Sequence, residues 1–313
     1  FPENVSFTLA EPTNSAFTLA EVLIVLALVG FLFTLTIPNL VQKQGSLEYI
    51  KKAKQMQKDL QTALTEVSAI NGNKNPDDWE TVRTSENKAE AITNELSKEI
   101  KVLSFCGASP LGCFAPKGYR TISGRSTNAV FQPLKPNRLT IDKEFPLEDT
   151  NQDEQLNVND LNAFYDDEQK SQQPQYTEAN PKSSVSFISL LDGGAAVIKT
   201  NSTYCDGLIS SIDKVKRPLC GTIIIDVNGP ARPNMLGVDV FGFYISGTSL
   251  VPMGFYGDDF SFNSNCLRNN MKNSENGLAC TAWALTNKNM DYRKCAAGDV
   301  IDWTTSTTCD NTP

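Results

Sequence analysis

The chain has 313 residues, of which 40% are hydrophobic and 20% are charged, and its formal net charge is −8. This composition is ordinary for a globular protein with a hydrophobic core, whereas binding to nucleic acid would require a clustered basic face. The absence of histidine excludes Ser-His-Asp and Cys-His nucleophile arrangements and every zinc site built on imidazole. We therefore expect neither an enzyme nor a nucleic-acid-binding protein.

The first element is an uncharged apolar run over residues 22–41, VLIVLALVGFLFTLTIPNLV. About 20 such residues in a helix cross a bilayer core, so the run predicts a membrane-spanning segment. A secretory signal carries its small-residue cleavage site after the apolar run, but here the small residue Ala16 precedes it. Glu21 stands at the start of the run, where a carboxylate is costly and usually functional. Cleavage between Ala16 and Phe17 would create an α-amino group to pair with Glu21 of a neighbouring copy.

These residues resemble the processing and methylation signature of type IV prepilins and type II secretion pseudopilins. Residues 16–24 read AFTLAEVLI, and a late proline, Pro38, follows in the apolar run. The resemblance implies cleavage before Phe17, N-methylation of Phe17, and alignment of subunits through Glu21. It covers about the first tenth of the chain. Ala16 stands where the family usually has glycine, and residues 1–15 lack the basic residues of prepilin leaders.

The resemblance also implies a function: a structural subunit, pilin or pseudopilin, of a type IV pilus or a type II secretion filament. Its partners would be copies of itself, other pilin-like subunits, the prepilin peptidase and, before assembly, the inner membrane. We expect a truncated leader over residues 1–16 and an inner-membrane helix over 17–41 that later forms the filament core. The globular part would be periplasmic or extracellular, although the lysines at 43, 51, 52, 54 and 58 predict the opposite by the positive-inside rule.

The pattern stays helical over residues 42–72. Apolar residues recur at three- and four-residue steps and predict one stripe of an amphipathic helix: Leu47, Ile50, Ala53, Met56, Leu60, Ala63, Leu64, Val67 and Ile70. Asn71-Gly72-Asn73 predicts the end of this helix, because Gly and Asn tolerate a left-handed conformation.

Residues 73–313 predict an α+β domain, in which a small antiparallel sheet packs on the amphipathic helix as in the pilin-like fold that the resemblance implies. A helix is expected over 88–102. Residues 184–190 and 195–198 flank Asp192-Gly193-Gly194 and predict a hairpin. Further strands are expected over 221–227 and 240–245. A short helix is expected over 278–290, with Trp283 on its buried face.

The cysteines predict disulfides in an oxidising compartment. There are eight, all after residue 100 and widely spaced, which is typical of a disulfide-stabilised extracytoplasmic domain. Buried free thiols are the alternative, and spacing alone does not determine the connectivity. Pairing of neighbours in the sequence would give Cys106–Cys113, Cys205–Cys220, Cys266–Cys280 and Cys295–Cys309.

The segment from Asp226 to Asp239 contains Asn228-Gly229-Pro230 and Pro233-Asn234. These residues favour a tight loop in which aspartate side chains cap local backbone groups. The segment also resembles a DxNG-type loop of pseudopilin-like chains, where an ion could bind. The structural interpretation is the favoured one.

Residues 149–160 predict a calcium loop inside an acidic insert over 142–181. Oxygen-bearing side chains fall at loop positions one, three, five, seven, nine and twelve, a spacing suited to a hard cation: Asp149, Asn151, Asp153, Gln155, Asn157 and Asp160. The pattern resembles the loop of dockerin modules, although Glu154 replaces the usual glycine. Calcium would order a surface loop here. The alternative is a solvated acidic insert.

Two other functions compete with the filament subunit. One is a membrane-anchored extracellular protein for calcium-dependent binding or adhesion. The other is a hydrolase based on carboxylates, which would need two convergent carboxylates in a cleft. Replacement of Glu21 by alanine distinguishes the filament subunit from an anchored monomer, because only assembly requires the carboxylate.

Overall fold

The computed structural model describes residues 18–115, 118–132, 184–200, 205, 207–210, 216–270, 272–294 and 301–304; of residues 32–44, 184, 207–210, 216 and 217 it describes only the backbone. The chain forms two compact units, Phe1–Gly45 and Ser46–Pro313. Helix α1 (Leu19–Ile70) contains the boundary between them and includes Pro38.

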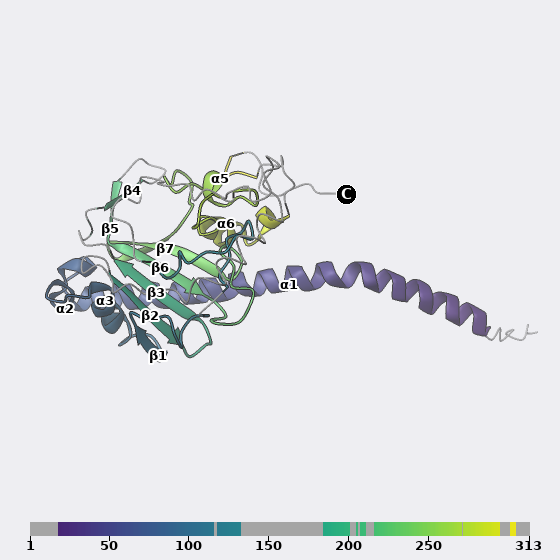
Figure 1. The fold of residues 1–313 in the computed structure, drawn as a ribbon, viewed down its shortest axis with the longest axis horizontal. Helices are drawn as coiled ribbons and strands as arrows, with labels where there is room; N and C mark the ends of the chain where they lie inside the picture. Colours follow the sequence, from purple (N-terminus) through teal and green to yellow (C-terminus); the bar gives the residue numbers. More distant parts are fainter. Residues whose placement is uncertain are drawn as a thin grey trace, which may run out of the picture. The chain divides into compact units, whose positions relative to one another are not determined.

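The second unit is built on a six-stranded antiparallel sheet, shown in Figure 1. Its order is β1 (Val102–Gly107), β2 (Ser184–Leu190), β3 (Ala195–Thr200), β6 (Gly221–Asp226), β7 (Val240–Ser246) and β8 (Ser249–Pro252). Strands β4 (Gly207–Ser210) and β5 (Lys216–Leu219) form a separate antiparallel pair. The other elements are η1 (Pro76–Asp78), α2 (Glu80–Arg83), α3 (Lys88–Leu96), α5 (Phe262–Asn265), α6 (Cys280–Asn287) and η2 (Asp291–Arg293).

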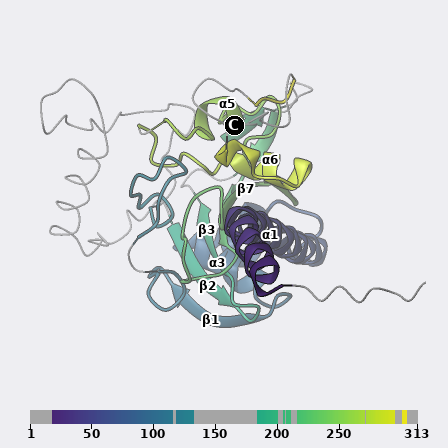
Figure 2. The same cartoon turned by 90° about the vertical axis from the view of Figure 1, so that its right-hand side faces the viewer.

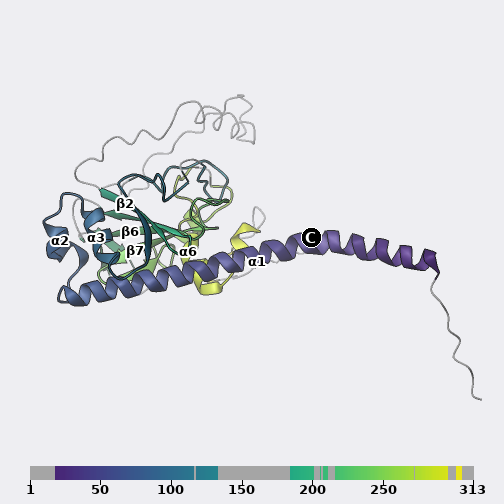
Figure 3. The ribbon, with the colours of Figure 1, turned by 90° about the horizontal axis from the view of Figure 1, so that it is seen from below.

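One face of the sheet packs on α1. Figures 1 and 3 show the second half of α1 running along this face, and Figure 2 shows the helix nearly end-on. Because side chains alternate along a strand, Ile223 and Ile225 of β6 join the core with α1, whereas Ile224 lies in the core on the opposite face. The helix contributes the predicted stripe to this core: Ile50, Ala53, Met56, Leu60, Ala63, Leu64 and Val67. Each buried Leu or Ile contributes about 1.5–3 kcal/mol of transfer free energy.

The opposite face carries a second core of loops and aromatic rings. Phe114, Tyr119 and Phe131 come from the segment after β1. Their rings pack on one another, and those of Phe114 and Phe131 also pack on Phe187 of β2, at centroid distances of 5.3–6.3 Å. Leu278 and Ala279, which precede α6, complete this core. The central strands therefore have both faces buried, which explains why they read as near-continuous apolar runs in the sequence.

The predicted α+β class is confirmed: the fold combines helices with an antiparallel disulfide-bonded sheet. The hairpin around Asp192-Gly193-Gly194 is present as β2 and β3. At the end of α1, Gly72 and Asn73 have φ values of 76° and 59°, and the N–H of Asn73 donates to the carbonyl of Ser68.

Several predicted boundaries are wrong. The helix expected over 88–102 ends at Leu96, and Val102 instead begins β1, which pairs with the edge of β2. Pairing with a neighbouring strand here overrides the local helical pattern. The helix expected over 278–290 is α6, which ends at Asn287 because Lys288 adopts φ 54°. Leu47 and Ile70, at the two ends of the predicted stripe, are exposed.

The predicted inner-membrane location, with the N-terminal helix as anchor, is corrected by the structure. No helix in the described residues contains a stretch long and apolar enough to cross a membrane. A span takes about 20 consecutive apolar residues, and the described side chains at the start of α1 extend only from Leu19 to Phe31.

Three of the four predicted disulfides are confirmed. The sulfur–sulfur bonds join Cys106 to Cys113, Cys205 to Cys220 and Cys266 to Cys280. The predicted fourth pair, Cys295 and Cys309, lies outside the described residues.

Candidate functional site

The first candidate surface is the start of α1 in the first unit. Between Leu19 and Phe31 every residue is exposed, and nine of them are large and hydrophobic: Leu19, Val22, Leu23, Ile24, Val25, Leu26, Leu28, Val29 and Phe31. We call this set the apolar helix surface. Because it includes five consecutive residues, it extends around the whole helix. A helix that is apolar on all sides is normally covered by other protein or by lipid.

Glu21 has a local partner at the beginning of this helix. Its Oε2 accepts hydrogen bonds from the backbone N–H and the hydroxyl of Thr18, at 2.8 and 2.9 Å. The hydroxyl oxygen of Thr18 in turn accepts from the N–H of Glu21 at 3.2 Å. This reciprocal arrangement is a capping box, whose Thr-x-x-Glu pattern is readable in the sequence. The hydrogen bond from the Thr18 backbone, then that from its hydroxyl, lowers the pKa of Glu21.

The expected processing residues Ala16 and Phe17 lie outside the described residues, as does the whole predicted calcium loop: Asp149, Asn151, Asp153, Gln155, Asn157 and Asp160. Pairing of Glu21 with a neighbouring N-terminus also stays a prediction.

No family model, curated protein or solved structure matches this chain.

The second candidate site is a pair of buried carboxylates in the loop between β6 and β7, residues 226–239, which we call the acidic loop. Asp226 ends β6 and Asp239 immediately precedes β7, and both have an exposed fraction of 0%. The N–H of Val227 donates to the carbonyl of Asp239 at 2.9 Å, which brings the two ends of the loop together. Because both side chains are fully buried, a substrate cannot reach them as it would reach the paired acids of a hydrolase.

Each carboxylate accepts hydrogen bonds, as predicted for capping aspartates. Oδ1 of Asp226 accepts from the N–H of Asn228 at 3.3 Å, and Oδ2 accepts a short hydrogen bond from the hydroxyl of Tyr119. Oδ2 and Oδ1 of Asp239 accept from the N–H groups of Asn234 and Met235, at 2.8 and 2.7 Å. The role of Tyr119 was not predicted, because it lies 107 positions from Asp226 in the sequence.

Burial changes the acidity of the pair. Desolvation, followed by the nearby charge of Asp239, raises the pKa of Asp226 from 3.8 to about 8. Desolvation also raises the pKa of Asp239, to about 6, although hydrogen bonds from Met235, Asn234 and the Asn228 side chain oppose this rise. Among the described residues none forms an ion pair with either carboxylate. Within the part of the chain that the structure describes, the pair therefore lacks the compensating charge that a buried carboxylate usually has.

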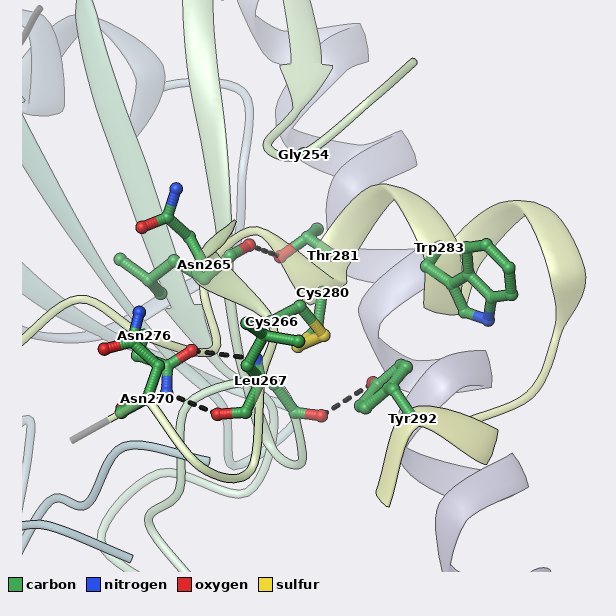
Figure 4. The surroundings of a disulfide bond; sticks show 12 residues. Gly254, Asn265, Cys266, Leu267, Asn270, Asn276, Cys280, Thr281, Trp283 and Tyr292 are labelled. Atoms are coloured by element: carbon green, nitrogen blue, oxygen red, sulfur yellow. Dashed lines mark hydrogen bonds between the residues drawn. A yellow bond between two sulfur atoms is a disulfide. The ribbon is translucent and has the colours of Figure 1, made fainter. Parts of the chain in front are cut away.

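The C-terminal part of the domain holds the acidic loop in place. The hydroxyl of the buried Tyr292 donates to the carbonyl of Gly237 at 2.7 Å. A Cβ added to Gly237 would lie 2.9 Å from Sγ of Cys280, so the loop packs directly on the Cys266–Cys280 disulfide. Figure 4 shows this disulfide, with Trp283 and Tyr292 to its right. Trp283 is fully buried and stacks on Phe262 at 4.5 Å, as predicted for a core aromatic.

One other group in the described residues contains metal-ligand atoms. A carboxylate oxygen of Asp77 and the sulfurs of Cys205 and Cys220 lie within 4.8 Å of one another. The sulfurs are joined in a disulfide and are therefore not thiolates, the form that binds metals. Calcium prefers oxygen ligands, so this group lends no support to a calcium site.

Proposed function

We propose that this protein is a structural subunit of a filament of the type IV pilus or type II secretion kind. Its apolar helix surface would pack against the same surface of other copies. The supporting observation is the exposure of nine large apolar side chains between Leu19 and Phe31, on a helix that also carries Glu21. Removing such side chains from water contributes roughly 25 cal/mol per Å² of buried apolar area.

The resemblance of residues 16–24 to the prepilin signature supports a second part of the proposal. A prepilin-type peptidase would cleave before Phe17, and the new N-terminus would be methylated. The capping box holds the carboxylate of Glu21 against Thr18, the residue that follows Phe17 in the sequence. In an assembled filament, the Glu21 carboxylate would align subunits by pairing with the terminal amino group of a neighbouring copy.

The folded domain is compatible with this function. A helix lying along one face of an antiparallel sheet is the arrangement expected of a pilin-like subunit, with the sheet and its loops facing outward. Folds host many functions, so the proposal rests on the apolar helix surface and the processing signature.

Assembly provides the test, with controls matched for exposure. Leu26 and Leu28 are 61% and 58% exposed in the apolar helix surface, whereas Leu111 and Leu191 are 60% and 58% exposed elsewhere in the chain. The full chain would be expressed with a prepilin peptidase, and filaments would be scored by electron microscopy and sedimentation. We expect Leu26→Ser/Leu28→Ser to abolish filaments and Leu111→Ser/Leu191→Ser to retain them. Equal assembly by both variants would contradict the proposal.

Processing is tested by the mass of the mature chain. A product that begins at methylated Phe17 supports processing, and an uncleaved leader contradicts it. Glu21→Gln should leave cleavage and folding unchanged but reduce the yield of filaments at least about tenfold, a change that corresponds to the loss of one intersubunit charge pair.

A further inference from the structure

The C-terminal part of the folded domain contains a small cavity walled by aromatic rings and carboxylates. Its volume is about 210 Å³, which is below the roughly 300–1,000 Å³ of pockets that take drug-sized ligands. The residues that give the wall its chemistry are Phe255, Tyr256, Asp258, Phe262, Asp302 and Trp303. Because Tyr256 is 44% exposed, a small ligand can reach the cavity from solvent.

The aromatic part of the wall is held in place by contacts with the core. The indole N–H of Trp303 donates to the carbonyl of Gly254 at 3.2 Å, and its ring lies 5.0 Å from that of Trp283. Phe262 stacks on Trp283 at 4.5 Å and meets Trp303 at 6.0 Å. These rings are therefore positioned before a ligand arrives, which lowers the entropic cost of binding.

The carboxylates of the wall are also fixed. Oδ2 of Asp258 accepts from the N–H of Gly254 at 2.7 Å, and its Oδ1 accepts from the N–H of Phe260 at 3.0 Å. Oδ1 of Asp302 accepts from the N–H and the hydroxyl of Thr304, at 2.6 and 2.8 Å. Two carboxylates thus stand at defined positions beside the rings.

Rings and carboxylates act in the same electrostatic direction. The face of an aromatic ring is its negative part, and it attracts a cation whose centre lies within about 6 Å, most strongly when the ring is an indole. The carboxylates add negative charge, and no lysine or arginine is among the residues that line the cavity. The wall therefore favours a cation over a neutral or an anionic ligand.

We propose that this cavity binds a small organic cation of the quaternary ammonium class. A metal ion would need oxygen lone pairs as ligands, but both oxygens of Asp258 already accept hydrogen bonds from backbone N–H groups. A quaternary ammonium group has no N–H to donate, so it needs no free acceptor. It is stabilised by the negative charge and by the ring faces alone. This site does not depend on the proposed filament function.

Calorimetric titration of the full chain with choline, and separately with 3,3-dimethylbutan-1-ol, tests the role of charge. The two probes have the same shape, and only choline is positively charged. We expect choline to bind in the millimolar range or more tightly, and the neutral probe to bind at least about tenfold more weakly, as loss of the cation–π attraction and of the carboxylate attraction implies. Equal binding of the two probes, binding of glucose without binding of choline, or no binding of choline would overturn the proposal.

Two variants with matched controls locate the bound cation. Tyr256→Leu removes an exposed ring from the wall, and its control is Phe105→Leu, because Phe105 is 39% exposed in β1. Asp302→Asn removes a charge from the wall and keeps the shape of the side chain, and its control is Asp259→Asn, because the exposed Asp259 does not line the cavity. We expect each test variant to weaken choline binding at least about threefold and each control to leave it unchanged. Equal effects of a test variant and its control would overturn the proposal.

A measurement on the wild type decides the question if a test variant does not fold. In saturation-transfer NMR, irradiation of the aromatic protons of the protein reaches a ligand that lies against them. We expect transfer to the methyl protons of choline, and loss of this transfer when excess tetramethylammonium chloride is added. Absence of transfer, or transfer that tetramethylammonium leaves unchanged, would overturn the proposal.

Discussion

The hydroxyl of Tyr119 donates a hydrogen bond to Oδ2 of Asp226, and this bond joins two segments 107 positions apart. Tyr119 comes from the loop segment over one face of the sheet, and Asp226 ends β6. Both groups are buried, so the bond forms without competition from water and helps to determine the position of the acidic loop.

Loss of this hydroxyl should destabilise the domain. We expect Tyr119→Phe to lower the free energy of unfolding by about 1–3 kcal/mol, because a buried acceptor on Asp226 loses its donor. Denaturant unfolding with EDTA present measures the change. Tyr256→Phe is the control, since Tyr256 is 44% exposed, and it should change stability by less than about 0.5 kcal/mol. An equal effect of the two substitutions would show that the buried hydrogen bond contributes nothing.

The buried carboxylates predict a dependence of stability on pH. Their pKa values in the folded protein, about 8 for Asp226 and about 6 for Asp239, lie above the ordinary value of 3.8. The folded state therefore binds protons more tightly than the unfolded state. The stabilisation that comes from this proton binding is fully present below about pH 4, and it is lost as the pH rises through 6 and then through 8.

We expect the free energy of unfolding in EDTA to fall by at least about 1 kcal/mol between pH 6 and pH 8.5. Asp226→Asn, which imitates the protonated side chain, should remove most of the upper part of this slope. Thermal and denaturant unfolding across the pH range measure the effect. A stability that rises over this interval, or a slope unchanged in Asp226→Asn, would contradict the assignment.

Gly237 and Gly72 provide a matched pair of backbone substitutions, because both have φ 76°. A Cβ at Gly237 would lie 2.8 Å from the carbonyl oxygen of Gly277 and 2.9 Å from Sγ of Cys280, whereas at Gly72 no atom lies within 4 Å. We expect Gly72→Ala to cost about 1 kcal/mol from backbone strain alone. Gly237→Ala should cost at least about 2 kcal/mol more, as overpacking does. Similar melting temperatures for the two variants would contradict the close packing of the acidic loop on the disulfide.

Asn276 organises the loop that the Cys266–Cys280 disulfide closes, as Figure 4 shows. The residue is fully buried. Its Oδ1 accepts from the N–H of Leu267 at 3.1 Å, and its Nδ2 donates to the carbonyls of Leu267 and Asn270, both at 2.7 Å.

We expect Asn276→Ala to lower the free energy of unfolding by roughly 3 kcal/mol, about 1 kcal/mol for each hydrogen bond. The exposed Asn263 is the control, and Asn263→Ala should be close to neutral. Chemical denaturation with the disulfides intact measures both variants. A neutral Asn276→Ala would mean that the disulfide alone organises the loop.

Local patterns in the sequence determined much of this protein. The recurrence of apolar residues at three- and four-residue steps predicts the buried stripe from Ile50 to Val67, because one face of the helix packs on the sheet. Asp192-Gly193-Gly194 predicts its hairpin because those residues suit a tight turn. The three described disulfides join cysteines that are neighbours in the sequence, although spacing alone does not determine the connectivity. The sequence also contained the Thr-x-x-Glu capping box, whereas the partner predicted for Glu21 is the N-terminus of a neighbouring copy.

Only the tertiary structure decided which distant residues meet. Tyr119 and Asp226 carry no shared pattern, and their contact exists because loops from different parts of the chain converge on one end of the sheet. The same convergence buries Asp226 and Asp239, so that residues expected to form a turn become a buried pair of carboxylates. β1 begins where a helix was expected to continue because the edge of β2 offered hydrogen bonds that no local sequence window contains. Burial, pKa and pairing depend on packing between elements far apart in the sequence, and packing arises only when the whole chain is folded.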